Sequence, residues 1–224
     1  MLDTSTHVTD CSSDLAAKLR DAIISGRFMP NERLIEADLA NAYKVNRANV
    51  RIALAMLDQE GLVVRERNRG ARVRLVTDEE ALEIAEARRV IEAMVARQAA
   101  ERANDRQKAA LRALMARMRA AYEKQDFNSY SQRNVEMHRA IQDIAANATA
   151  NRLLQTLKSQ VVRLQYRAIL QSGRPAKSLA EHGEIVDAIC ANDAPAAESA
   201  MRRHLCAVKN ALRQAMQAAK QGAY

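Results

Sequence analysis

The second half of the chain contains three histidines, and each has apolar residues at helical spacing around it. Their side chains can bind a metal. Neutral imidazole is the most common protein ligand for metals, and three histidines with one open position suit Zn²⁺ or a similar divalent ion. The pattern therefore predicts a metal site where three helices converge, and the alternative is three core histidines that are each satisfied by a hydrogen bond. The apolar neighbours at helical spacing are Ile141 and Ala145 for His138, Leu179, Ile185, Val186 and Ile189 for His182, and Met201, Leu205, Val208 and Leu212 for His204.

Arg88 lies on a similar stripe with Ile84, Ile91 and Val95. A buried guanidinium needs an anionic partner. Two partners remain open: Glu92, four residues on, would form an internal ion pair, whereas the carboxylate of a small organic acid would be held by two hydrogen bonds. Further candidates for an effector pocket are Arg139, Arg163 and Tyr166.

Residues 34–73 carry a second kind of chemistry. Asn46 suits the N-cap of a helix from Arg47 to about Gln59, on which Arg47 and Arg51 lie one turn apart, and Asn46 and Asn49 are expected at its exposed end. A helix fits the major groove of DNA, and Arg can bond both acceptors of guanine. This spacing favours a DNA-reading helix, and the alternative is an ordinary surface helix.

A basic hairpin is expected to follow this helix. Segments 62–65 and 71–75 are compatible with β-strands, and the residues between them include Arg67, Arg69 and Gly70. The negative potential of a narrow minor groove attracts arginine. The hairpin tip is therefore a candidate for an adjacent minor groove.

The elements that must position these residues are mainly helical. We expect a disordered tail over 1–12, a DNA-binding domain over 13–76 and a helical effector-binding and dimerisation domain over 77–220. The first helix is predicted to start after Ser12 or Ser13, and Ser178 is predicted to cap a later helix. The fold class is mainly α, with a small β-hairpin in the first domain and an all-α bundle in the second. Helices are expected over about 36–43, 47–59, 78–104, 106–125, 127–146, 149–171, 178–192 and 195–219.

Composition narrows the class of protein. The 224 residues carry a formal net charge of +8, which fits a polyanionic partner, whereas the aromatic content of 3% disfavours single-strand binding by base stacking. The three cysteines form no CxxC pair, and no apolar run has the length of a membrane span. A reducing cytoplasm is the expected setting.

Residues 15–75 closely resemble the winged helix-turn-helix domain of GntR-type regulators. The shared framework is I-x-S-G-R-x-x-P, L-x-E-x-x-L-A, V-x-R-x-x-V-R-x-A-L, L-x-x-E-G-L-V and N-R-G-A-x-V. The resemblance implies that Arg47 and Arg51 contact an operator, that Arg33 lies near the DNA backbone, and that Gly70 lets the wing approach the minor groove. Asn31, Asn46, Ala48 and Asn49 depart from the usual pattern, so the operator sequence is not implied.

Residues 78–220 resemble the FCD ligand-binding domain of the FadR subgroup. The matching pieces are R-R-V-I-E, N-x-x-x-H, A-x-x-N-R-L-L, S-L-A-E-H-x-x-I-V-D-A-I and A-x-x-x-M-R-R-H-L. The resemblance implies that His138, His182 and His204 bind a divalent metal, with Asn134 at a position that is Asp in metal-binding members. An amide oxygen can coordinate a metal but brings no charge, so a lower affinity is expected. A metal-free pocket remains the alternative.

Together these features predict a homodimeric transcription regulator that binds a pseudo-palindromic DNA operator, and the family resemblance implies that it is a repressor. A small organic acid bound among the C-terminal helices would control it. Two alternatives remain. One is a metal-dependent enzyme that uses the three histidines, although no HExxH motif or associated carboxylate pair supports it. The other is a DNA-binding protein without an effector.

Overall fold

The computed structural model describes residues 4–66, 70–157 and 173–221, and side-chain positions from Cys11 onward within these ranges. Arg67, Arg69, Arg163 and Tyr166 lie outside the described residues. The described chain forms two compact units, one that ends at Thr77 and one that begins at Asp78. Among the described helices, none combines the length and apolar character that a membrane span requires.

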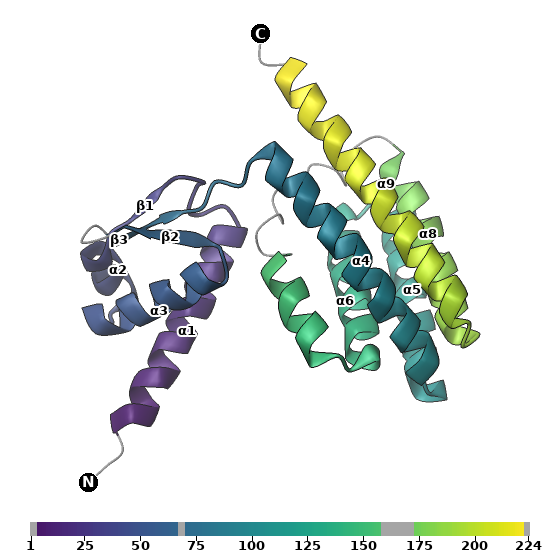
Figure 1. The fold of residues 1–224 in the computed structure, drawn as a ribbon, viewed down its shortest axis with the longest axis horizontal. Helices are drawn as coiled ribbons and strands as arrows, with labels where there is room; N and C mark the ends of the chain where they lie inside the picture. The colour runs from purple at the N-terminus through teal and green to yellow at the C-terminus, as the bar shows by residue number, and fades with distance from the viewer. Residues whose placement is uncertain (1–3, 67–69, 158–172, 222–224) are drawn as a thin grey trace. The chain divides into compact units, whose positions relative to one another are not determined.

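The N-terminal unit consists of three helices and a small antiparallel sheet (Figure 1). Its sheet has the strand order β1-β3-β2, so the central strand β3 pairs with both neighbours. Apolar residues of all three helices and of the sheet form one core, which fixes the two helices that follow β1 against α1. The elements are α1 (Thr4–Ile24), β1 (Arg33–Leu34), α2 (Glu36–Tyr43), α3 (Arg47–Gln59), β2 (Val63–Glu66) and β3 (Gly70–Val73).

The first helix begins earlier than its sequence signals indicate. α1 starts at Thr4, so the predicted helix start after a cap at Ser12 or Ser13 is wrong. Ser12 is instead fully buried inside the helix, where its Oγ donates a hydrogen bond to Oδ1 of Asn49 at 3.4 Å. A serine that would otherwise favour a helix end is accommodated within α1 because α3 supplies a partner for its hydroxyl.

Gly70 occupies a backbone position that other residues would strain. Its φ is +85°, and a Cβ added there would lie 2.4 Å from the carbonyl oxygen of Leu34. The neighbouring strand β1 is therefore what requires glycine at the start of β3. The structure explains Gly70 by this contact within the sheet, without any approach of the wing to DNA.

Replacing Gly70 with alanine should lower the free energy of unfolding of the N-terminal unit by about 2 kcal/mol or more, because a Cβ is strained at positive φ and collides with backbone. Urea denaturation followed by circular dichroism measures this change. Gly183 provides the matched control, since a Cβ added there meets nothing within 4 Å. Gly183→Ala, inside a helix, should raise stability by about 0.5–1 kcal/mol. Equal effects of the two substitutions would contradict the role of the Leu34 contact.

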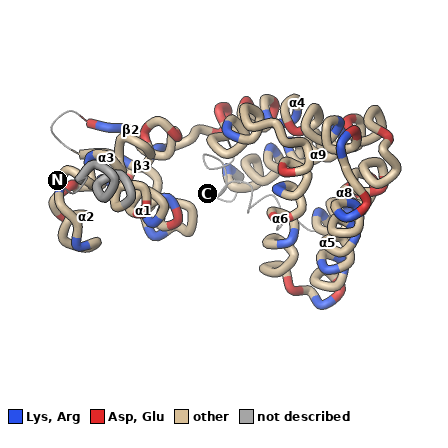
Figure 2. Tube along the Cα trace, turned by 90° about the horizontal axis from the view of Figure 1, so that it is seen from below, with Lys and Arg blue, Asp and Glu red and all other residues tan. Residues whose placement is uncertain are grey.

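The C-terminal unit is a bundle of long helices (Figure 1). α4 lies along α9, and their neighbours enclose an apolar core rich in alanine and methionine. Basic and acidic residues are interleaved along these helices (Figure 2), as expected for solvated helix faces. The elements are α4 (Asp78–Arg102), α5 (Asp105–Glu123), α6 (Phe127–Ala145), α8 (Arg174–Cys190) and α9 (Ala194–Gln221), and residues 148–157 are also helical.

Local capping explains several helix starts in this unit. Asn104 forms a reciprocal capping box with Gln107 at the start of α5, and Asp193 accepts a hydrogen bond from the Ala196 N–H at the start of α9. The predicted cap at Ser178 is wrong, because α8 begins at Arg174 after Gly173, whose φ is +74°. Ser178 therefore lies inside α8 and is available for another contact.

Candidate functional site

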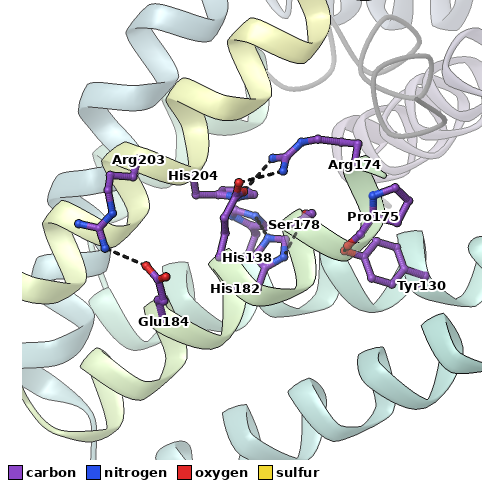
Figure 3. Close-up of polar contacts among 10 residues, drawn as sticks. Tyr130, His138, Arg174, Pro175, Ser178, His182, Glu184, Arg203 and His204 are labelled. Carbon is purple, nitrogen blue, oxygen red and sulfur yellow. Dashed lines mark hydrogen bonds and ion pairs between the residues drawn. The ribbon is translucent and has the colours of Figure 1, made fainter. Parts of the chain in front are cut away.

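The three predicted histidines converge in the core of the C-terminal unit. His138 comes from α6, His182 from α8 and His204 from α9, and their exposed fractions are 7%, 0% and 3%. One ring nitrogen from each lies within 4.8 Å of the other two. Figure 3 shows the three side chains gathered in one place, and Nε2 of His138 lies 3.3 Å from Nε2 of His182.

Each imidazole has an oxygen-bearing side chain at its other nitrogen. Nδ1 of His138 lies 2.9 Å from Oε2 of Glu92, Nδ1 of His182 lies 3.3 Å from Oγ of Ser178, and Nδ1 of His204 lies 2.7 Å from Oε2 of Glu181. Such partners fix the orientation of ligating histidines in metal sites. With Nδ1 of each ring beside an oxygen, Nε2 is the nitrogen that could face a metal ion.

Both carboxylates that contact the histidines are paired with arginine. Arg88 donates to Oε1 of Glu92 from Nε at 2.9 Å and from Nη2 at 2.7 Å, with exposed fractions of 5% for Arg88 and 2% for Glu92. Arg174 donates to Oε1 and Oε2 of Glu181 at 3.0 and 2.9 Å (Figure 3). Of the two partners that the sequence left open for Arg88, the structure contains the internal ion pair with Glu92.

Burial and neighbouring charge set the protonation of this cluster. Complete burial, together with the charges of His204, His138 and Arg174, holds the pKa of His182 well below its usual value. Burial would raise the pKa of Glu181, but hydrogen bonds from His204 and Arg174 outweigh this effect and lower it. His182 is therefore neutral and Glu181 ionised near pH 7, the forms that a ligand and its carboxylate partner require.

Asn134 adds an oxygen on the helix that carries His138. Its Oδ1 is buried and has no hydrogen-bond partner among the described residues, one turn before His138 on α6. Buried polar atoms are rarely left without a partner. The three imidazole nitrogens form a donor set that suits a divalent transition metal, so the residues present fit such an ion, and the unpartnered amide oxygen on α6 is a candidate for a further ligand.

Of the other predicted pocket residues, the structure describes Arg139. Arg139 is exposed on α6, so it does not join the buried cluster. Sequence reasoning gave no site role to Glu181, Arg174 or Ser178. Glu181 directly precedes His182 in the sequence, but its contact with His204 depends on how α8 packs against α9. The sequence alone therefore could not assign it to the site.

The predicted DNA-reading residues lie at the start of α3 and on the sheet. Arg47 and Arg51 are exposed on α3, and Nε of Arg51 lies 2.7 Å from Oε2 of Glu36 on α2. Asn46 caps α3, since its side chain accepts a hydrogen bond from the Asn49 N–H at 2.8 Å. Arg33 is exposed on β1.

Asn49 corrects the sequence-based prediction for this surface. Its side chain was expected at the exposed end of α3, but it is only 6% exposed and bonds Ser12 on α1. Asn49 therefore anchors α3 to the core of its unit. The exposed residues of the first turn are Asn46, Arg47 and Ala48.

Comparison with protein families matches both parts of the chain. Residues 11–73 match the family described as bacterial regulatory proteins, gntR family, and residues 83–207 match the FCD domain. The chain is a GntR-family transcription regulator. The exposed arginines of α3 lie within the gntR segment, and all three histidines lie within the FCD segment. As a transcription regulator with a gntR segment and an FCD domain, the chain is a DNA-binding protein and not an enzyme.

Two relatives of this GntR-family regulator are named as transcriptional repressors. The HTH-type transcriptional repressor GlaR of Escherichia coli K12 is 30% identical over 210 residues, which cover 88% of this chain and 94% of the relative. The HTH-type transcriptional repressor RspR of the same organism is 27% identical over 199 residues, or 89% of this chain and 87% of the relative.

Solved structures share the fold. A putative transcriptional regulator GntR from Rhodococcus sp. RHA1 has a TM-score of 0.68 at 26% identity, covering 95% of this chain and 98% of that one. Escherichia coli McbR/YncC has a TM-score of 0.75 at 19% identity, covering 91% and 97%. The mainly α architecture, with a winged helix-turn-helix followed by a helical domain, is thereby confirmed.

Proposed function

We propose that this regulator is a homodimeric repressor whose DNA affinity is controlled by a small organic acid bound with a divalent metal in the FCD domain. The observation that supports it most directly is the convergence of three buried imidazoles from three helices, each with its second nitrogen beside an oxygen. A histidine that only fills a core needs one hydrogen-bond partner. Three ring nitrogens from three helices within 4.8 Å of one another are the arrangement that a metal requires.

Zn²⁺ is the proposed ion, because three neutral imidazoles form a borderline-soft donor set that leaves a coordination position open. The metal would supply Lewis-acid attraction for an anionic ligand. His138, His182 and His204 would hold it, and Asn134 would offer the amide oxygen. Because Arg88 is engaged with Glu92, we propose that an effector carboxylate is recognised at the histidine cluster instead of at Arg88.

The proposed DNA-reading residues are Arg47 and Arg51 on α3, with Arg33 and the hairpin arginines Arg67 and Arg69 at the backbone or minor groove. Two copies of a short recognition helix, related by a two-fold axis, would read a pseudo-palindromic operator. An effector can change operator affinity only to the extent that it binds the two states of the dimer with different affinity.

The test first isolates a duplex that the full-length protein selects from a random pool. Fluorescence anisotropy then measures its affinity with organic acids added to Zn²⁺-loaded and chelated protein. We expect at least one acid to weaken operator binding in the metal-loaded protein and to raise its melting temperature, because a native-state ligand stabilises the fold. If no acid changes either quantity in the loaded protein, effector control by this site is wrong.

Arg47→Ala should weaken binding to the selected duplex by about 1–3 kcal/mol, since a base-contacting arginine contributes on this scale. Arg51→Ala should weaken binding in the same way but by a smaller amount. Arg51 must give up its ion pair with Glu36 to contact DNA, which lowers its net contribution. Anisotropy at several salt concentrations measures both variants. Arg117→Ala is the matched control, because this exposed arginine of α5 lies in the helical domain and its loss removes the same charge. An equal loss in all three variants would show a general charge effect, contrary to the proposed contacts.

A further inference from the structure

Both acids that contact the histidine cluster are themselves paired with arginine. Glu92 and Glu181 contact His138 and His204, and each of these carboxylates is neutralised by an arginine, Arg88 or Arg174. More distant ion pairs on the same helices, Arg133–Glu136 and Arg203–Glu184, also join one acid to one base. Each carboxylate that contacts a histidine is therefore offset by the positive charge of one arginine.

The buried side-chain oxygen that lies one helical turn before His138 is neutral. Asn134 precedes His138 by one helical turn, and its buried Oδ1 has no hydrogen-bond partner among the described residues. An amide can donate a lone pair to a metal, but it cannot offset the charge of a divalent cation. A divalent ion bound by three imidazoles and this amide would retain its full charge in a buried site, which is unfavourable.

We infer that metal binding at this centre depends on a carboxylate supplied from outside the chain, because Asn134 and the paired acids leave the ion's charge uncompensated. A divalent cation and a small carboxylate then bind cooperatively, each raising the affinity of the other. The inference rests on the proposed function, in that the histidines are taken to bind a metal. It assigns to Asn134 the role of making metal occupancy depend on the organic acid.

This cooperativity can be measured by titrating either ligand. The factor by which acetate raises metal affinity equals the factor by which metal raises acetate affinity. The probe is Zn²⁺ with sodium acetate, a carboxylate that binds the free metal only weakly. Full-length protein is titrated with Zn²⁺ against a chromophoric chelator, in sodium acetate or in sodium chloride of equal ionic strength. Complexation of Zn²⁺ by acetate in solution works in the opposite direction and is equal for all variants.

For the unmodified chain, acetate should lower the Zn²⁺ dissociation constant by about tenfold or more, within the usual range of coupling between two sites. Asn134→Asp builds the missing carboxylate into α6, so it should tighten Zn²⁺ binding in chloride by a similar factor and remove most of the acetate effect. Gln132→Glu is the matched control, because it adds the same charge at an exposed position of α6 and should change neither value.

Tight Zn²⁺ binding by the unmodified chain that is independent of acetate would overturn this inference and leave the proposed metal site intact. Absence of Zn²⁺ binding in both salts would overturn the proposed metal site and the inference with it. The acetate titration of the unmodified chain decides between these outcomes even if Asn134→Asp does not fold, and circular dichroism reports the folding of each variant.

Discussion

Replacing Glu92 with leucine is expected to lower the free energy of unfolding of the C-terminal unit by about 3–5 kcal/mol, because it leaves the buried guanidinium of Arg88 without its carboxylate. Both side chains are almost fully buried, and Arg88 directs two hydrogen bonds to one oxygen of Glu92. The same substitution removes the carboxylate beside Nδ1 of His138. Urea denaturation followed by circular dichroism measures the loss.

The double variant Arg88→Met with Glu92→Leu separates the unpaired charge from a loss of packing. Replacing both members of a buried ion pair by apolar residues of similar volume is often neutral, so the double variant should recover most of the stability that the single variant loses. Arg88→Met alone completes the cycle and gives the coupling between the two residues. If the double variant is as unstable as Glu92→Leu, packing around Glu92 dominates and the unpaired guanidinium does not.

Replacing His182 with alanine is expected to weaken Zn²⁺ binding by about 100-fold or more, since loss of an outer-shell partner alone costs about 10–100-fold in metal affinity. His182 is fully buried, and its ring contacts both of the other imidazoles. Competition with a chromophoric chelator in acetate measures the dissociation constant. Operator binding in the absence of acid should remain, because the arginines of α3 belong to the N-terminal unit.

His7→Ala is the control for this substitution, because His7 is the one histidine outside the cluster and belongs to α1. It should retain the metal affinity of the unmodified chain. Zn²⁺ binding by His182→Ala with an unchanged dissociation constant would show that the ion is held elsewhere. Circular dichroism of both variants verifies that the helical content is retained.

Periodicity was sufficient to predict the three histidines, because the spacing of apolar residues determines which face of a helix is buried. The stripes around His138, His182 and His204 placed them in the core, and the structure brings them together. Neither period nor propensity could show that Glu181 contacts His204, because that pair joins two helices whose packing involves many other residues.

The small polar residues show why other local predictions were wrong. Ser12, Ser178 and Asn46 all belong to types that cap helices, but only Asn46 does so here. Ser12 and Ser178 have partners on Asn49 and His182, inside the helices. A serine hydroxyl that bonds another side chain does not compete for the backbone hydrogen bonds of the helix, so the helix can continue through it. Local sequence lacks this information, because the partner of Ser12 is 37 residues away.

The buried contact between Ser12 and Asn49 has a consequence for how this regulator can change its target during evolution. One face of the first turn of α3 is occupied in holding the helix to α1, while Arg47, Ala48 and Arg51 remain on the exposed face. In the proposed mode of DNA reading, substitutions at the exposed positions would alter the preferred operator without disturbing the anchor, whereas a change at Asn49 would act on the packing of α3 against α1. Under the proposed function, stability and target choice would thus belong to different residues of one short helix, and new specificities would be accessible through few mutational steps.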